Sequence, residues 1–558
     1  MGGMVRTWFD RPKILVLCAA LLGFAAVLGV SVWALSGDGD GSNGDAGAGS
    51  AEDTDATAPS ATDSAPPTPK RPDRLGPAPE AVPAVRDWQP VRGPGWKPGD
   101  GGRVVADAGG PLEDEARLLA RELKIPYAEG PARTGDVELR TAGTKGTADK
   151  ADKGGTTARE SYVLTSRDGR VRITGSSDAG VFYGTRTLLQ TVRAQGGFAD
   201  GVVRDRPDRA QRGFMLDIAR KHFSAEWIED RIREMGDLKL NQLQLHLSDD
   251  QAFRVESDSH PEVVSDPHLT KKQVRDIVRL AKSRHITVIP EIDSPGHLGA
   301  VLEKHPGLQL KNASGTPVQG AVDIANPDAA KIVDDLLNEY AELFPGPYWH
   351  LGGDEYRALM SEDPAAAYPE LAAAARERYG ARAGVQDLAT AWLNDRAAVV
   401  RKHGKTPQVW NDGMHRGGTV KPSKGREVAY WTGKEIGERE PVEYLREGWK
   451  VVNLNDEFLY YVLGEPNDFT YPTGERIYEQ WTPAVVRGTE PVPKALSGPD
   501  RILGGRFAVW CDLADSQTQE QVAKGIRMPL KATAQKLWDP REPRLNWREF
   551  NALADRVE

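Results

Sequence analysis

Two adjacent carboxylates stand out as residues that could do chemistry. Asp354 and Glu355 follow a short apolar run and two glycines in the segment YWHLGGDEY, residues 348–356. Glycine lets a backbone come close to a ligand, and parallel sheets place their chemistry at the carboxyl ends of strands. One carboxyl of such a pair can stay protonated while its neighbour is ionised, which divides acid and base work. An isolated Asp-Glu pair is usually a solvated surface feature, so its meaning depends on the other strands.

The elements that would position this pair form a repeating pattern in residues 208–558. Short apolar runs occur at residues 213–219, 242–247, 286–292, 348–351, 408–410, 427–431, 450–454 and 506–510. Stretches with helical periodicity lie between or after them, at residues 225–239, 271–284, 329–343, 388–403 and 518–530. Repeated alternation of strand and helix predicts a (β/α)8 TIM barrel.

The residues after these runs are strongly polar or aromatic. They include Asp217, His246, Asp249, Glu291, Asp293, His297, Asp354, Glu355, Trp410, Asp412, Trp431, Asn453, Asp456, Trp510 and Asp512. A lone aspartate after a strand is often a helix cap, but a barrel brings all eight carboxyl ends to one face. Carboxylates accept hydrogen bonds from hydroxyls, and indole faces pack on sugar rings. The pattern therefore predicts one site for a neutral, polyhydroxylated ligand.

The overall composition excludes several classes of function. The chain has 558 residues and a formal net charge of −9, without a basic block or arginine stripe, so nucleic acid is not expected as a partner. It has no glycine-rich loop followed by Lys-Ser or Lys-Thr, which argues against a nucleotide phosphate site. Its two cysteines, Cys18 and Cys511, are too few for a disulfide scaffold.

The amino terminus carries a topological signal. Basic residues precede residues 14–35, an uncharged run long enough to span a bilayer as a helix. The basic flank predicts a cytoplasmic start and a remainder on the extracellular face of the cell membrane. A signal peptide cleaved near residues 34–36 is the alternative, and it would make the protein secreted. Residues 1–36 are therefore assigned as a cytoplasmic start followed by a transmembrane anchor or signal peptide.

Two further segments precede the barrel. Residues 37–84 consist mainly of Gly, Ala, Asp, Ser, Thr and Pro, which predicts a disordered linker. Residues 85–207 predict a small α/β accessory domain with helices at 112–123 and 178–192 and a hairpin at 162–174. This domain shows no group of reactive residues, so supporting the barrel is its expected role.

Four motifs in the barrel region resemble, in type and order, those of glycoside hydrolase family 20, the β-N-acetylhexosaminidases. They are RGFMLD at residues 212–217, HLSDDQ at 246–251, PEIDSPGH at 290–297 and HLGGDE at 350–355. The small domain also resembles the α/β domain that commonly precedes that family's barrel. The resemblance implies an exo-acting, retaining glycosidase that removes terminal non-reducing N-acetylhexosamine, GlcNAc or GalNAc, from glycans.

The resemblance also implies substrate-assisted catalysis, in which the substrate's own acetamide attacks the anomeric carbon and forms an oxazolinium intermediate. By this analogy Glu355 is the catalytic acid that protonates the leaving oxygen and later the base that activates water. Asp354 would orient the acetamide and stabilise the positive intermediate. His297 and Asp249 match a supporting relay that tunes Glu355.

The same resemblance assigns residues that bind substrate. Arg212 corresponds to the arginine that binds hydroxyls of the terminal sugar, and Trp410, Trp431 and Trp510 match the aromatic box around the acetamide and the sugar face. Asp512 stands where the family commonly has a glutamate that holds the 4- and 6-hydroxyls. Because aspartate is one methylene shorter, that contact is in doubt.

In the family, a tyrosine of the seventh strand contacts the acetamide oxygen. Tyr460 is the candidate adopted for this role, and Tyr461 is the alternative. The expected place in the motif also fits Phe458, so the sequence alone leaves this assignment open.

Two other functions fit parts of the pattern. A metal-dependent hydrolase would use ligand types found at the strand ends, namely His246, Asp249, His297, His350 and Asp354. The chain has no tight His-x-His or His-Glu-x-x-His grouping, so we expect no metal and no cofactor. A non-catalytic lectin would keep the barrel and lose the chemistry, which the intact pair of Asp354 and Glu355 argues against. The expected partner is a glycan with a terminal N-acetylhexosamine.

Overall fold

The computed structural model describes residues 75–99, 101–142, 155–434 and 439–558. The predicted membrane span at residues 14–35 and the linker up to residue 74 lie outside these ranges. Among the described helices, none combines the length and the apolar character needed to cross a membrane.

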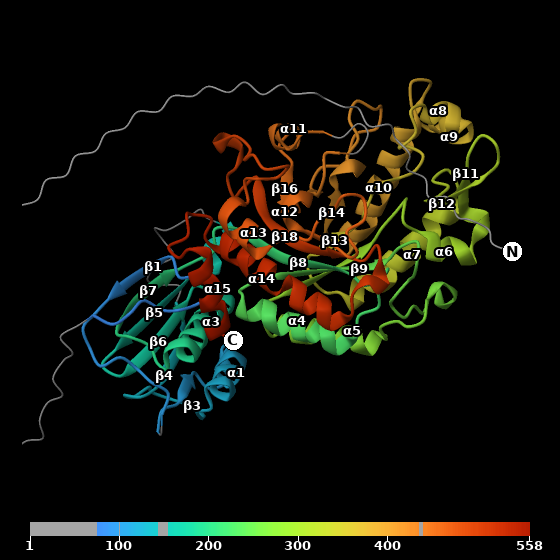
Figure 1. Cartoon of the computed structure of the whole chain (residues 1–558). Coiled ribbons are helices and arrows are strands. Elements are labelled where there is room, and N and C mark those ends of the chain that lie inside the picture. Colours follow the sequence, from blue (N-terminus) through green and yellow to red (C-terminus); the bar gives the residue numbers. More distant parts are fainter. Residues whose placement is uncertain (1–74, 100, 143–154, 435–438) are drawn as a thin grey trace, which may run out of the picture. The chain divides into compact units, whose positions relative to one another are not determined.

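Eight parallel strands form a closed barrel, confirming the predicted TIM barrel (Figure 1). They are β8 (Gln211–Asp217), β9 (Gln242–Ser248), β10 (Thr287–Ile292), β13 (Tyr348–His350), β14 (Thr406–Trp410), β15 (Glu427–Tyr430), β16 (Lys450–Asn453) and β18 (Ile502–Trp510). The order of neighbours is β16-β15-β14-β13-β10-β9-β8-β18, and pairing between β16 and β18 closes the ring. Every apolar run identified in the sequence became one of these strands.

Amphipathic helices follow the strands and cover the barrel. The longer ones are α4 (Ala225–Asp237), α5 (Lys271–Lys282), α7 (Pro327–Leu343), α10 (Val385–Lys402) and α14 (Gln519–Trp538). Their starts are set by side-chain caps: Ser224 accepts the N–H of Trp227, and Thr270 forms a capping box with Gln273. Helices α4 and α5 lie side by side outside β8 and β9 in Figure 1.

Shorter elements fill the connections between strands and helices. They are η1 (Pro261–Val263), α6 (Gly299–Lys304), η2 (Pro306–Leu308), β11 (Gln309–Lys311), β12 (Pro317–Val322), α8 (Pro364–Ala367), α9 (Pro369–Tyr379), η3 (Asn411–Gly413), α11 (Pro441–Arg446), α12 (Asp456–Leu459), β17 (Tyr460–Val462), α13 (Gly474–Gln480), η4 (Lys494–Leu496), η5 (Ala514–Ser516) and α15 (Trp547–Arg556). Strand β17 was not predicted; it pairs in parallel with the end of β18.

The preceding small domain is a seven-stranded sheet with helices, as predicted. Its order is β1-β7-β5-β6-β4-β2-β3, built from β1 (Asp87–Pro90), β2 (Val104–Ala106), β3 (Tyr127–Glu129), β4 (Val137–Thr141), β5 (Tyr162–Arg167), β6 (Arg170–Gly175) and β7 (Gly201–Asp205), with α1 (Glu113–Leu123), α2 (Gly155–Arg159) and α3 (Asp178–Gln195). The hairpin of β5 and β6 turns through Asp168 and Gly169, whose φ angles are 52° and 70°. Such positive φ values suit an Asp-Gly turn.

The folded chain begins earlier than the sequence suggested. Residues 75–84 were predicted as linker, yet Val82 is 0% exposed. Its N–H donates to the side chain of Gln190 at 2.7 Å, and its carbonyl accepts from the same side chain at 3.1 Å. Composition did not reveal this segment because its anchor lies on α3, far along the chain.

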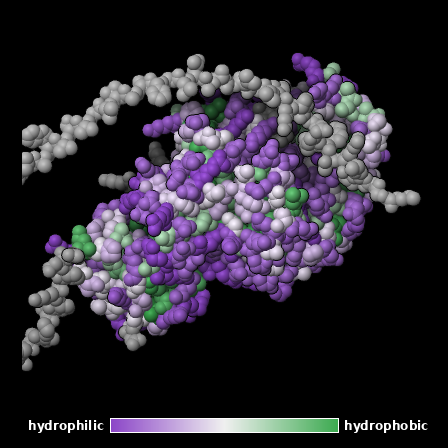
Figure 2. All heavy atoms as spheres, in the orientation of Figure 1, coloured by the Kyte–Doolittle hydropathy of each residue, from purple (hydrophilic) through white to green (hydrophobic). Residues whose placement is uncertain are grey.

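Most large hydrophobic side chains of the described residues are buried. Among the described residues, three large hydrophobic side chains are exposed, namely Leu75, Val163 and Leu513. The face drawn in Figure 2 is mostly hydrophilic, and its hydrophobic side chains occur in small separate groups. The face shown in Figure 2 therefore offers no large apolar patch for a ligand or partner.

A buried ion pair joins the small domain to the amino end of β8. Arg212 is 0% exposed, and its guanidinium donates to Glu160 at 2.7 Å. It also donates to the carbonyl of Lys239 at 2.9 Å and to the hydroxyl of Tyr183 at 3.2 Å. A charge at this depth is tolerated only while its partners are present.

We expect Arg212→Met to destabilise the protein by about 3 kcal/mol, because it leaves Glu160 buried without its cation. The double variant with Glu160→Gln should recover part of this loss. Urea unfolding of residues 75–558 measures both. Arg117→Met, which removes a surface pair with Glu113, is the control and should leave the midpoint unchanged. A midpoint for Arg212→Met equal to that of the control would contradict the role of the ion pair.

Candidate active site

The pair of Asp354 and Glu355 lies directly beyond β13, where two glycines make its position accessible. Gly352 and Gly353 have φ angles of 69° and 103°, a region that side chains other than glycine resist. A Cβ on Gly352 would lie 1.7 Å from Oδ1 of Asp293. Gly353 donates its N–H to the same oxygen at 2.8 Å. The glycines therefore bring the two carboxylates against the end of the neighbouring strand, β10.

His297 lies between the carboxylate pair and Asp249. Its Nε2 is 3.5 Å from Oε2 of Glu355 and 3.6 Å from Oδ2 of Asp354, while its Nδ1 is 3.2 Å from Oδ1 of Asp249. Burial alone would lower the pKa of His297, but the charges of Asp249 and Asp354 raise it well above the ordinary value. His297 is therefore held as a cation next to Glu355.

Glu355 combines accessibility with a charged neighbour. Its side chain is 35% exposed, the greatest exposure in the carboxylate and histidine group around it. Burial would raise the pKa of Glu355, but the hydrogen bond and charge of His297 outweigh it, so the pKa lies below the ordinary value. The raised pKa of His297 and the lowered pKa of Glu355 favour the proton on His297, 3.5 Å from Glu355, from where it can be passed to a group that Glu355 contacts.

Asp293 is kept neutral beside Asp354. Burial raises the pKa of Asp293 well above the ordinary value, and the nearby charge of Asp354 raises it further. Two carboxyls in one buried place cannot both be ionised at low cost. The neutral carboxyl of Asp293 can donate to Asp354, but Oδ1 of Asp354 is buried and receives no N–H from the described residues. Asp354 thus offers a buried acceptor to a ligand.

A second buried carboxylate, Glu291, orients the aromatic part of the site. It accepts from the indole N–H of Trp410 at 2.7 Å, and it contacts His246 at 3.1 Å and His350 at 2.9 Å. Burial would raise the pKa of Glu291, but His350 and His246 hold it well below the ordinary value. His246 and His350, which the sequence offered as possible metal ligands, therefore stabilise the charge of Glu291. Glu291 in turn fixes the indole of Trp410.

Aromatic side chains form a continuous wall next to the carboxylates. Trp410 and Trp510 lie 5.9 Å apart between ring centroids, and Tyr460 lies 6.0 Å from Trp510. Trp431 stacks on Tyr460 at 5.8 Å with an angle of 5° between the rings. Phe469, which lies between β17 and α13, extends this stack on the other side of Tyr460. The predicted three tryptophans are thus brought together.

The structure distinguishes the two tyrosines of β17. The hydroxyl of Tyr460 is buried and has no hydrogen-bond partner within the described ranges. Tyr461 points to the opposite side of the strand, as alternation requires, where it contacts Gln517 at 3.1 Å and stacks on Tyr471 at 4.2 Å. Phe458 lies under Arg476, 4.4 Å from the ring centroid, away from the wall. Tyr460 is therefore the tyrosine that joins the site.

Arg212 is not part of the cluster, which corrects the sequence-based assignment. It lies at the amino end of β8 and is fully buried against the small domain, whereas the cluster lies at the carboxyl ends. Arg220 is the arginine that reaches the cluster: it contacts Asp217 at 3.0 Å and Asp249 at 2.8 Å, and its guanidinium lies 5.3 Å from the ring of Trp510. A cation three residues beyond a strand-terminal aspartate was the sequence signal that could have found it.

Asp512 lies at the rim of the cluster. It lies two residues beyond the end of β18 and is exposed. Burial would lower the pKa of Arg220, but the charges of Asp217, Asp249 and Asp512 raise it. The Asp512 carboxylate therefore lies within electrostatic range of Arg220. Arg220 and Asp512 thus form a polar edge beside Trp510.

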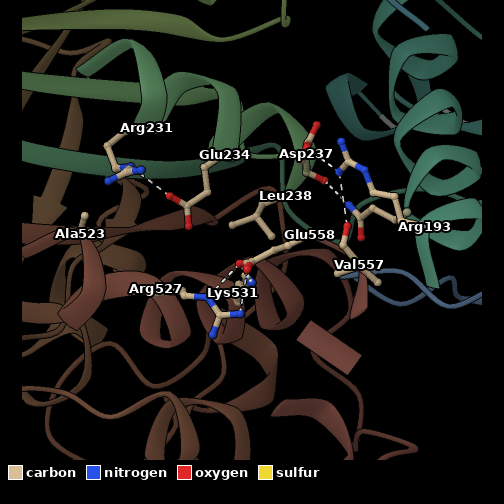
Figure 3. Close-up of a pocket in the computed structure, with 11 residues that line it drawn as sticks. Arg193, Arg231, Glu234, Asp237, Leu238, Ala523, Arg527, Lys531, Val557 and Glu558 are labelled. Atoms are coloured by element: carbon tan, nitrogen blue, oxygen red, sulfur yellow. Dashed lines mark hydrogen bonds and ion pairs between the residues drawn. The ribbon is translucent and has the colours of Figure 1, made fainter. Parts of the chain in front are cut away.

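A separate cavity of about 400 Å³ lies between α3, α4, α14 and α15 (Figure 3). Its charged side chains are paired with one another: Arg231 with Glu234, Arg193 with Asp237, and both Arg527 and Lys531 with Glu558. No residue of the carboxylate and aromatic cluster lines it. Because its charges are satisfied internally, we regard this cavity as structural.

Solved structures of known enzymes share this fold. The GH20 β-N-acetylhexosaminidase of Streptomyces coelicolor A3(2) superposes with a TM-score of 0.67 and 25% sequence identity, over 87% of this chain and 96% of that one. The D313A variant of the Streptomyces plicatus β-hexosaminidase in complex with GlcNAc gives the same TM-score and identity, and covers 87% of this chain and 95% of that chain.

Sequence comparison finds relatives with related names. A lacto-N-biosidase of Bifidobacterium bifidum is 31% identical over 487 residues, which is 86% of this chain and 41% of that protein. A β-hexosaminidase of Porphyromonas gingivalis is 33% identical over 310 residues, 50% of this chain and 38% of that protein. The chain therefore spans less than half the length of these two relatives.

Two family descriptions match almost the whole described chain. The model for "Glycosyl hydrolase family 20, domain 2" matches residues 78–206, which is the small domain. The model for "Glycosyl hydrolase family 20, catalytic domain" matches residues 210–541, which is the barrel and more than half of the chain. The chain therefore belongs to glycosyl hydrolase family 20.

Proposed function

We propose that this protein is an exo-acting, retaining β-N-acetylhexosaminidase that removes a terminal non-reducing N-acetylhexosamine from a glycan. One observation carries the proposal. Oδ1 of Asp354 is buried and receives no N–H from the described part of the chain, and the proton of the buried Tyr460 hydroxyl has no acceptor there. An acetamide supplies what these two atoms lack, namely one N–H and one carbonyl oxygen.

The acetamide would act as the nucleophile. Asp354 accepts its N–H while Tyr460 donates to its carbonyl oxygen, and together they aim that oxygen at the anomeric carbon. Bond formation there and departure of the leaving group give an oxazolinium ion, whose positive charge the Asp354 carboxylate stabilises. Neutral Asp293 supports this step because it does not compete with Asp354 for the cation.

Glu355 would deliver the proton to the departing oxygen. The proton comes from the group of His297, Asp249 and Glu355, in which His297 lies 3.5 Å from Glu355. After departure the ionised Glu355 takes a proton from water, which attacks the intermediate from the same side and retains the configuration. The exposure of its side chain suits both steps, since leaving group and water must reach it.

The remaining cluster residues would hold the sugar. Trp410, Trp431 and Trp510 provide faces for the ring and the acetamide methyl. Arg220 takes the role first assigned to Arg212 and binds hydroxyls together with Asp512, because both lie at the polar edge beside Trp510. No metal or cofactor enters this mechanism.

The place of action stays a proposal as well. Residues 14–35 lie outside the described ranges, and their uncharged sequence together with the basic residues before them supports a membrane anchor or a cleaved signal peptide. On this basis we propose that the enzyme works on glycans at the extracellular face of the membrane or after secretion.

A second candidate function is release of a terminal lacto-N-biose unit in place of a single sugar. The 31% identity with a lacto-N-biosidase over 86% of the chain favours it. Asp512 also favours it, because a short, exposed side chain at the rim leaves more room for an additional sugar than glutamate would. Both candidates use the same acetamide chemistry.

Release of nitrophenol by residues 75–558 tests the function and separates the two candidates. We expect release from the β-N-acetylglucosaminide that persists in EDTA at 25 °C. Faster release from the β-lacto-N-bioside would favour the second candidate. Glu355→Gln should lower hydrolysis of oligosaccharides, measured as free sugar released, by about 10²- to 10⁴-fold, since their alcohol leaving groups need the acid. Glu362→Gln, an exposed glutamate seven residues on, is the matched control. Glycan binding without release from either substrate would indicate a lectin.

Asp354→Asn should slow formation of the cyclic intermediate by about 10²- to 10³-fold, because a neutral amide stabilises the cation poorly. It should also move the alkaline limb of the pH profile of kcat/KM to lower pH. The sign follows from His297, whose pKa is raised in part by the charge of Asp354 and falls when that charge is removed. An unshifted alkaline limb would show that His297 does not supply the proton.

Tyr460→Phe should lower kcat/KM by about 10- to 100-fold, because it removes a hydrogen bond to an oxygen that becomes part of a charged intermediate. Tyr461→Phe is the matched control on the same strand and should change kcat/KM by less than about twofold. Equal effects of the two substitutions would reject the assignment of Tyr460 to the acetamide.

A further inference from the structure

A group of metal-ligand side chains lies outside the carboxylate and aromatic cluster. His260, Glu262 and His305 each offer one ligand atom, and these atoms all lie within 4.8 Å of one another. Nδ1 of His260 is 3.0 Å and Nε2 of His305 is 2.9 Å from the same oxygen, Oε1 of Glu262. Two imidazoles and one carboxylate therefore converge on one point.

The backbone holds these residues in place. The loop before His260 is tied to Glu339 of α7: Ser257 donates its hydroxyl at 2.8 Å and Ser259 its N–H at 3.1 Å. Pro261 begins the short helix η1, and His305 lies between the end of α6 at Lys304 and the start of η2 at Pro306. The three ligand side chains thus project from restrained segments and pay little ordering entropy on binding.

A further carboxylate orients His260. Nε2 of His260 lies 3.4 Å from Oδ2 of Asp335 on α7, while its Nδ1 faces Glu262. A histidine that binds a metal characteristically donates its other ring N–H to a carboxylate, which fixes the ring and its tautomer. Asp335 supplies this arrangement, so the group has a supporting carboxylate as well as three ligand atoms.

The two distances to Oε1 of Glu262 fit the edges of a tetrahedral site as well as they fit hydrogen bonds. Ligand atoms about 2.0–2.1 Å from Zn²⁺ lie about 3.3 Å from one another, within a few tenths of an ångström of the two distances here. His268 provides the contrast, because it contacts the carboxylate of Asp266 at 3.0 Å without a second histidine. That pair is an ordinary surface contact, whereas the His260 group has the ligands for coordination.

We propose that His260, Glu262 and His305 bind a divalent cation of the zinc class. Two imidazoles and one carboxylate are the donor set of such ions and not of Ca²⁺ or Mg²⁺, which prefer oxygen ligands. Glu262 is 41% exposed, so the ion can enter from solvent and keep water in its fourth position. This site is independent of the proposed glycosidase activity.

The site would link two loops that reach the candidate active site. His260 follows Asp249 by eleven residues in the loop after β9, and His305 follows His297 by eight residues in the segment after β10. Asp249 and His297 are themselves in contact at 3.2 Å. A bound ion therefore joins the outer parts of both loops and restricts the motion of the segments that carry this contact.

Titration of the chain, residues 75–558 stripped of metal, with Zn²⁺ and with Co²⁺ tests the site. We expect one ion per chain, a visible absorption band of bound Co²⁺, and a Tm that rises with Zn²⁺. His260→Ala and His305→Ala should each weaken binding by at least about 100-fold and abolish the rise in Tm, and Asp335→Asn should weaken it by about tenfold. His268→Ala is the matched control and should bind as the unaltered protein does.

The double variant His260→Ala, His305→Ala gives the decisive result. Undiminished binding in this variant would place the ion elsewhere and overturn the proposal, as would absence of binding in the unaltered protein or a loss in His268→Ala equal to that in His260→Ala. Circular dichroism of each variant establishes that it is folded. Nitrophenol release is measured alongside and should persist in the variants, so failure of the metal site and failure of the proposed function are distinguishable.

Discussion

The crowding of carboxylates at the carboxyl end of the barrel is the constraint on which the rest of the site depends. Buried there are Asp217, Asp249, Glu291, Asp293 and Asp354. Unpaired buried charges repel one another and lose hydration, so each must be paired or neutralised. Asp249 is surrounded by Arg220, His246 and His297, Glu291 is held between His246 and His350, and Asp293 keeps its proton. Asp217 pairs with Arg220. Asp354, beside His297, keeps an oxygen that receives no N–H from the described chain and can face a ligand.

The same charges position the apolar half of the site. Glu291 accepts the indole N–H of Trp410, and Asp412 accepts both the backbone N–H of Glu355 at 2.8 Å and the indole N–H of Trp431 at 3.1 Å. Asp412 therefore ties Glu355 to the aromatic wall through one carboxylate. Because Glu355 has a positive φ of 46°, which costs energy for a residue with a side chain, this N–H contact also helps to hold its backbone conformation.

The fold was readable from sequence because its signals are local. Each barrel strand is an apolar run, and Ser224 and Thr270 mark helix starts within three residues of the groups that they cap. The missed features depend on contacts between distant residues. Val82 is ordered by Gln190, and Tyr460 differs from Tyr461 only once β17 is known to be a strand whose neighbouring side chains point in opposite directions. The raised pKa of Asp293 likewise needs the fold, since it arises from burial and from the nearby charge of Asp354.

Arg220 and not the predicted Arg212 lies near the cluster, and the reason is a piece of information that a sequence motif does not contain. A parallel strand advances about 3.3 Å per residue, so Arg212 lies roughly 16 Å before Asp217 along β8, at the opposite end of the barrel. A motif names residues without the direction of the strand. When that direction is added, only residues at or beyond Asp217 can reach a ligand at the carboxyl face, and Arg220 is the first cation there. Arg212 acts on the site through the fold instead, because its ion pair with Glu160 secures the start of the strand that ends in Asp217.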